Sequence, residues 1–239
     1  GGNNAEVTIR TDHTNVTCIK KNGVTVLEKP IVPAEEEAKS LWRIEDVLDA
    51  ARNMPLDNVK HLLQRQIDFN MAISKEGLTN DYGASIGKIL LRRDPDSLRI
   101  RARASAADAR MNGCELPVVI TSGSGNQGIT ASVPVVVYAH ALAAGEEKML
   151  RAVLLSDLVT IYLKQGIGKL SAYCGAISAG CGAGAAIAFL YDCTDDQIEH
   201  AVENALAINS GIICDGAKSS CAAKIAMAVE GGLMGGRIT

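Results

Sequence analysis

The chain has 239 residues, of which 47% are hydrophobic and only 3% aromatic, and its formal net charge is −3. A chain of this length can bury a sizeable core. With so few aromatic residues, that core must be built from Ala, Val, Ile and Leu, which favours closely packed helices over a β-sandwich. Lys and Arg are scattered, so the chain lacks the basic field that a nucleic-acid partner requires. No apolar run is long enough to span a membrane without a charge or a helix breaker, and we expect no membrane association.

Seven cysteines, an odd number, occur in a chain that shows no signal-peptide pattern at its start. An odd count cannot be fully paired in disulfides, so we expect reduced thiols and a cytoplasmic protein. The chain lacks an initiator Met and opens directly into a strand-like pattern. We therefore expect it to be an N-terminally truncated piece of a longer protein.

The first thirty residues predict two or three antiparallel strands. Apolar and polar residues alternate over three short stretches, residues 6–10, 16–19 and 24–27. Asn22-Gly23 is the pair that a two-residue hairpin turn requires, because both positions need positive φ. We expect residues 1–33 to form a β-hairpin that is the remnant of a missing N-terminal domain. Residues 34–239 then form a helical domain, which makes the fold mainly α, of the α+β class.

Beyond Pro33 the apolar residues recur at steps of three and four, the period of an amphipathic helix. This pattern predicts helices over residues 41–51, 59–71, 84–91, 98–111, 134–144, 146–162 and 194–208. Gly77 and Asn112-Gly113 are expected to end two of them. Thr194 and Gln197 have the spacing of a capping box. His61 lies beside the apolar face of the second helix, and we assign it no role.

A glycine-rich polar stretch, residues 117–134, is the first candidate binding element. Its backbone N–H groups, with Ser122, Ser124, Asn126 and Gln127, could cradle a carboxylate or a phosphate. We expect a loop here and a helix that begins beyond it, with Pro134 in the first turn. The glycine spacing fits neither a P-loop nor a dinucleotide-binding turn. A purely structural turn is the alternative.

The same loop suggests a rival function, because Ser-Gly-Asn-x-Gly resembles the substrate-carboxylate loop of pyridoxal-phosphate enzymes related to threonine dehydratase and cysteine synthase. Those enzymes also need a Schiff-base Lys on an upstream strand and strands that alternate with helices. The chain before the loop predicts helix after helix. A pyridoxal-phosphate lyase is therefore kept only as an alternative.

Cysteines set among small residues form the second candidate element. A Gly/Ala-rich stretch begins at Cys174, and Cys214 and Cys221 follow the helix predicted over residues 194–208. Thiolates beside glycines can approach an iron-sulfur cluster closely, because no bulky side chains occupy the space around them. The other cysteines, Cys18, Cys114, Cys181 and Cys193, are interpreted as small buried residues.

Four motifs carry a resemblance to a known family, and they lie at residues 104–111, 122–130, 170–174 and 211–217. They resemble a family of bacterial and archaeal proteins that includes L-cysteine desulfidase. The chain is similar, more distantly, to the alpha chain of the iron-sulfur L-serine dehydratases. The resemblance implies a [4Fe-4S] cluster with Cys174 and Cys214 among its ligands. The third ligand is either Cys221 or a residue outside the chain, because the Gly-Cys-Thr-Glu-Pro motif of the desulfidases is absent from these 239 residues.

The implied activity is removal of the β-substituent of a small amino acid. Three thiolates leave one iron of a four-iron cluster open to act as a Lewis acid, while a base removes the α-proton. His140 is a candidate base because it follows the loop and titrates in a useful range, although a structural or surface histidine is the alternative. Arg110 is a candidate second partner of the substrate carboxylate, although an exposed ion pair is the alternative.

A thiol leaving group suits iron-sulfur chemistry better than a hydroxyl does. We therefore expect a carbon–sulfur lyase that converts L-cysteine to sulfide, pyruvate and ammonia. L-Serine dehydration and an inactive fragment without a cluster remain the alternatives. The expected partner is a small amino-acid substrate, and a homo-oligomer is left open.

Overall fold

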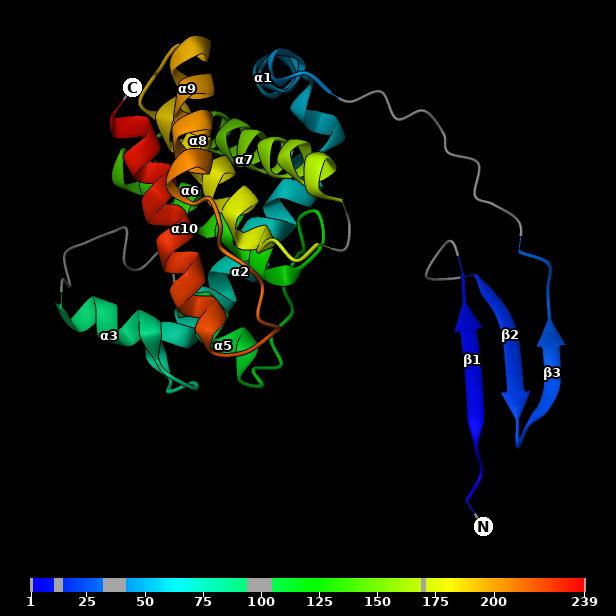
Figure 1. The fold of residues 1–239 in the computed structure, drawn as a ribbon. Helices are drawn as coiled ribbons and strands as arrows, with labels where there is room; N and C mark the ends of the chain where they lie inside the picture. The colour runs from blue at the N-terminus through cyan, green and yellow to red at the C-terminus, as the bar shows by residue number, and fades with distance from the viewer. Residues whose placement is uncertain (1, 11–14, 32–41, 94–104, 169–170, 239) are drawn as a thin grey trace. The chain divides into compact units, whose positions relative to one another are not determined.

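A computed structural model describes residues 2–10, 15–31, 42–93, 105–168 and 171–238. Its contacts divide the chain into two compact units, residues 1–40 and residues 41–239 (Figure 1). The first unit holds a small antiparallel sheet and the second is helical, so the mainly α fold with a small β part is confirmed. The view that the sheet is the remnant of a larger domain stays a prediction.

The sheet has the order β1-β2-β3 and consists of β1 (Ala5–Ile9), β2 (Val16–Lys21) and β3 (Val24–Glu28). Asn22 and Gly23 join β2 to β3 with φ angles of 52° and 81°, as the hairpin turn requires. The apolar side chains of β1 and β3 are largely exposed. This small sheet therefore has little hydrophobic core of its own.

The helical unit contains helices in the predicted order and two that the sequence analysis did not predict, over residues 175–190 and 220–237. Its described helices are α1 (Ile44–Asn53), the 3₁₀ turn η1 (Leu56–Asn58), α2 (Lys60–Thr79), α3 (Ile86–Arg93), α5 (Ser105–Met111), α6 (Gly125–Ala141), α7 (Glu146–Ile167), α8 (Gly175–Leu190), α9 (Asp195–Ile208) and α10 (Ser220–Arg237). The predicted capping box at Thr194 and Gln197 opens α9 and is confirmed. Part of the helix predicted over residues 98–111 lies outside the described residues. The prediction that Gly77 ends a helix is wrong, because α2 continues through this buried glycine to Thr79.

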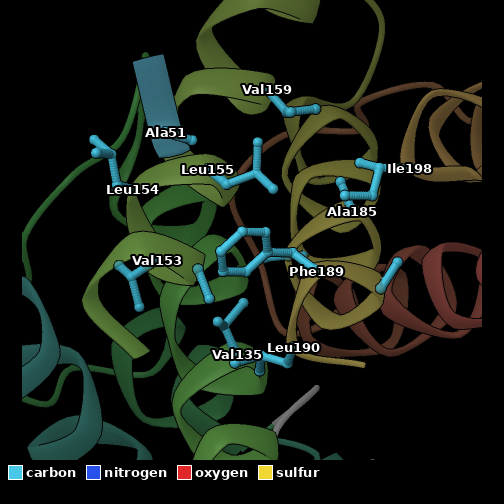
Figure 2. Close-up of a cluster of buried hydrophobic side chains, with 14 of the residues drawn as sticks. Ala51, Val135, Val153, Leu154, Leu155, Val159, Ala185, Phe189, Leu190 and Ile198 are labelled. Atoms are coloured by element: carbon cyan, nitrogen blue, oxygen red, sulfur yellow. The ribbon is translucent and has the colours of Figure 1, made fainter. Parts of the chain in front are cut away.

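Most residues of α8 are buried, which makes this Gly/Ala-rich helix the centre of the unit. It packs against α6, α7, α9 and α10. Figure 2 shows the ring of Phe189 among aliphatic side chains such as Val135 of α6 and Val153 and Leu155 of α7. Because α8 carries small side chains, the surrounding helices supply most of the apolar volume of the core.

Glycines bring the backbones of α8 and α10 into direct contact. A Cβ at Gly180 would meet the backbone of Ala228, and one at Gly184 would meet that of Gly232. Both pairs are 48 positions apart in the sequence, so the two helices run parallel. Their N-termini therefore lie at the same end of the unit, which brings Cys174, just before α8, level with Cys221 at the start of α10.

Helix α6 begins earlier than the sequence analysis predicts. It starts at Gly125, so Pro134 lies inside the helix and not in its first turn, and the second half of the expected loop is helical. Packing explains why a glycine stands at position 128 of this helix, since a Cβ there would collide with the carbonyl oxygen of Val119. The described residues between 115 and 215 form helices and two isolated bridges, with no parallel sheet. The pyridoxal-phosphate alternative loses its structural basis.

Replacing Gly184 with Val tests the close packing of α8 on α10. The new side chain would meet the backbone of Gly232, which cannot move without separating the two helices. We expect the free energy of unfolding to fall by about 3 kcal/mol in urea titrations. Gly166→Ala is the matched control, because a Cβ there meets no neighbour and Ala favours the helix by about 0.5 kcal/mol. Equal stability of Gly184→Val and the parent would contradict the contact.

Candidate active site

Two loops that hold cysteines are joined by their backbones. Cys174 is the N-cap residue of α8, and Cys214 is exposed in the segment between α9 and α10. The N–H of Cys174 donates to the carbonyl of Ile212 at 3.2 Å, and the N–H of Cys214 donates to the carbonyl of Ala172 at 2.7 Å. This short antiparallel pairing fixes the two loops side by side and places both cysteines at one end of the helical unit.

The third thiol and a lysine complete the group. Burial raises the pKa of Cys174, and the nearby Cys214 and Cys221 thiols raise it further, whereas the N–H of Ala176 and the charge of Lys224 lower it. Lys224 also donates to the carbonyl of Ile213 at 3.0 Å and pairs with Asp215. Since Lys224 and Cys221 both belong to α10, the lysine ties the loop of Cys214 to the helix of Cys221.

The chemistry of these donors can be compared with the ligands that metals prefer. Among the described residues, no three His, Cys, Asp or Glu side chains form a group suited to a single metal ion. A four-iron cluster is larger than one ion and takes thiolate ligands on the order of 6 Å apart. Asp215, the carboxylate nearest in sequence, is already held by Lys224 and Lys218. A donor set of three thiols fits the ligand chemistry of an iron-sulfur cluster.

Three helix N-termini converge beside these thiols. In addition to α8 and α10, the first turn of α6 lies here, because a Cβ at Gly175 would collide with the side chain of Gln127. The far ends of the three helices also meet, since Tyr138 of α6 lines a cavity with Ile187 of α8 and Leu233 of α10. Each helix N-terminus carries a partial positive charge of about one-half. Their combined field favours thiolates and carboxylates at this end.

The predicted substrate loop supplies polar groups next to the cysteines. Ser124 caps α6 by accepting the N–H of Gln127 at 3.3 Å. The Oδ1 atom of Asn126 accepts from Nη1 of Arg110 at 3.0 Å. Ser122 is exposed at the turn, with a φ of 60°. The structure therefore brings Ser124, Asn126 and Arg110 together.

A buried amide of the same turn, that of Gln127, was predicted only as one of the polar side chains of the loop. Gln127 is 6% exposed, and its Nε2 donates to Ser124 at 3.2 Å. Its Oε1 finds no partner within the described part of the chain. The amide lies against Gly175, next to Cys174, and joins the polar loop to the cysteines. Its packing against the start of α8 was not predicted, because Gly175 lies 48 positions away in the sequence.

His140 is not brought to this group. It is exposed near the C-terminal end of α6, fourteen residues after Asn126, which corresponds to about 21 Å along a helix. Its neighbours lining a surface groove belong to α2 and to the end of α6. The proximity of His140 to the loop in the sequence does not translate into proximity in space, and this argues against His140 as the base.

The remaining cysteines lie outside the group of three thiols. Cys181 is fully buried in α8, and burial raises the pKa of its thiol to about 12, which suits an unreactive core residue. Cys18, Cys114 and Cys193 are half-buried.

Comparison with known proteins identifies the family. The family model described as serine dehydratase alpha chain matches residues 13–238. The chain belongs to the serine dehydratase alpha chain family. This membership confirms the resemblance found in the sequence.

Relatives of this family member are UPF0597 proteins. The chain is 48% identical to one from Desulfitobacterium hafniense (strain Y51) over 93% of its own length and 53% of that protein. It is 47% identical to one from Lachnoclostridium phytofermentans over 98% of its length and 57% of that protein. The chain thus spans about half the length of the relatives it matches. No solved structure matches it.

One carboxylate of this family member lies beneath the polar loop and was missed by the sequence analysis. Asp157, in the middle of α7, accepts from Thr121 Oγ1 at 2.8 Å and from Gln66 Nε2 at 2.9 Å. Burial raises its pKa to about 6, and these two hydrogen bonds only partly oppose the shift. A signal was present, because Asp157 is the one charged residue between Ala152 and Val159, a run in which every other residue except Ser156 is apolar.

Replacing Asp157 with Asn tests the raised pKa. A pKa of about 6 in the fold, against 3.8 ordinarily, means that the neutral acid is favoured, so stability is lost as the pH rises through 6. Asn does not ionise and avoids this loss. We expect the stability of Asp157→Asn relative to the parent to rise by about 2 kcal/mol between pH 4 and pH 8. Urea titrations at both pH values measure the free energy of unfolding of the two proteins. A difference between them that does not change with pH would show that the pKa of Asp157 is not raised.

Proposed function

We propose that this chain forms the cluster-binding part of a lyase that removes the β-substituent of a small amino acid, with L-cysteine as the substrate. The products are sulfide, pyruvate and ammonia. The observation that supports this most directly is the gathering of Cys174, Cys214 and Cys221 beside the N-termini of α6, α8 and α10. Membership of the serine dehydratase alpha chain family supports a lyase.

In this proposal the three thiols hold a [4Fe-4S] cluster. When bound, the cluster supplies an open iron that acts as a Lewis acid towards the leaving group. Lys224 offsets part of the negative charge of the thiolates and keeps the loop of Cys214 in place. Thiol ligands require a reducing compartment, so we place the reaction in the cytoplasm.

The polar loop binds the substrate in this proposal. Arg110 presents N–H donors to the substrate carboxylate, and Asn126 orients the guanidinium by accepting one of its hydrogen bonds. The helix N-terminus at Ser124 favours the same negative charge. Gln127, the residue that follows Asn126, packs against Gly175 and links this loop to Cys174.

L-Serine dehydration is the second candidate. It is favoured by the description of the matching family, serine dehydratase alpha chain. The two substrates differ only in the leaving group. The preference for cysteine rests on the affinity of a soft thiolate for iron and on the Cys-Asp-Gly-Ala sequence at residues 214–217.

The cysteine ligands can be tested one at a time in the full-length protein, reconstituted under anaerobic conditions. We expect Cys174→Ser, Cys214→Ser and Cys221→Ser to lose most of the iron and acid-labile sulfide, because a hydroxyl is a poor cluster ligand. Cys193→Ala is the control, since Cys193 lines a cavity at the far ends of α6, α8 and α10, and should retain both.

The outcome of this assay separates the alternatives. Full iron content in Cys221→Ser would move the third ligand outside this chain. Full content in Cys174→Ser or Cys214→Ser would refute the cluster site. A parent protein without iron would support the inactive-fragment alternative.

The substrate is decided by comparing kcat/KM for L-cysteine, followed by sulfide release, with kcat/KM for L-serine, followed by pyruvate formation. We expect a value at least about tenfold larger for L-cysteine, because the thiolate leaving group binds iron more readily. A larger value for L-serine would reverse the assignment. Asn126→Ala, made on the same protein, should lower kcat/KM for the preferred substrate without changing the fold.

A further inference from the structure

The carboxyl group of Asp157 belongs to a small network that reaches the polar loop from below. A single oxygen, Oδ1, accepts both the hydroxyl of Thr121 and the amide of Gln66. Gln66 also donates to the hydroxyl oxygen of Thr121 at 3.1 Å. The Thr121 side chain, 5% exposed, is therefore held on two sides, by α7 and by α2.

Thr121 is the first residue of the turn that leads into α6. Its carbonyl accepts the N–H of Gly123 at 2.8 Å, and its backbone pairs with Ser124. Between them Ser122 adopts a φ of 60°, a conformation that residues other than glycine rarely adopt. Such a turn persists only when its ends are fixed by the surrounding structure. Fixing Thr121 thus fixes Ser124, the cap of α6, and the two residues that follow it.

We propose that Asp157 is a positioning residue for substrate binding, which holds Thr121 and, through it, the turn that sets Ser124 and Asn126 beside the cysteine site. This inference rests on the proposed function of the loop. It assigns Asp157 no contact with the substrate. Its effect is on the geometry of the carboxylate-binding groups.

The segment before the turn has a second anchor that does not involve Asp157. Asp157 is therefore not the only group that attaches this segment to the helices. Asn70 of α2 makes two hydrogen bonds with the backbone of Val119, one to its N–H at 3.0 Å and one to its carbonyl at 3.2 Å. That neutral amide already attaches the segment to the helices. Asp157 adds a carboxylate that is costly to bury, since its pKa is raised to about 6, and this carboxylate contacts the turn at Thr121 as well as Gln66 of α2.

The experiment uses the full-length, cluster-reconstituted enzyme with Asp157→Ala, Thr121→Val and the double variant. We expect each single change to raise KM for L-cysteine about tenfold, with kcat within about twofold of the parent, because binding geometry is lost and the chemistry is not. The double variant should be no worse than either single one, because both remove the same connection. Asp157→Asn should restore KM, since its carboxamide oxygen can accept both hydrogen bonds.

Ser156→Ala is the matched control. Ser156 is the neighbouring residue on α7, and its buried hydroxyl donates to the carbonyl of Ala131, away from the turn. This variant should lower the unfolding midpoint but leave KM unchanged. Amide hydrogen exchange of residues 119–127 should quicken in Asp157→Ala and Thr121→Val and not in Ser156→Ala.

Unchanged KM in Thr121→Val, additive effects in the double variant, or a loss confined to kcat would overturn the inference. If Asp157→Ala does not fold, Thr121→Val and Asp157→Asn decide it alone. A parent enzyme that converts neither L-cysteine nor L-serine defeats the proposed function instead. Hydrogen exchange of the turn then still shows whether Asp157 positions it.

Discussion

The close contact between α8 and α10 is the constraint on which the rest of the helical unit depends. Two backbones can approach this closely only where Gly180, Gly184 and Gly232 present no side chain. The contact fixes both the direction and the relative height of the two helices. The position of Cys174 relative to Cys221 along the helix axes is therefore set by packing in the core, away from the two thiols.

Negative charges at the candidate site are destabilised by partial burial and stabilised by the groups around them. The half-buried thiols of Cys174 and Cys221 and the carboxylate of Asp157 are unfavourable when charged, because they lose part of their contact with water. The N-termini of α6, α8 and α10, together with Lys224, offset this cost for anions at one end of the unit. The same field that favours thiolates favours a substrate carboxylate, so one arrangement of helices serves the proposed metal ligands and the proposed substrate.

Local signals in the sequence predicted local structure well. Asn22-Gly23 and the capping box at Thr194 each depend on a few adjacent residues, and both are confirmed. The predicted start of α6 was wrong because Gly125 and Gly128 look like loop residues. Both lie within the helix, where the missing Cβ leaves room for a neighbouring segment. The network around Asp157 joins α2, α7 and a turn that lie far apart in the sequence, and periodicity carries no information about such contacts.

The exposure of the loop around Cys214 has a consequence for assembly. Residues 213–218 are exposed, whereas the apolar core of the unit lies among the helices and includes no residue of this loop. The apolar core of the unit is thus separate from the loop of Cys214, in contrast to a zinc finger, where folding and metal binding are one event. In the proposed site, a cluster would approach from the solvent side, where Cys214 is the exposed thiol and Cys174 and Cys221 are half-buried.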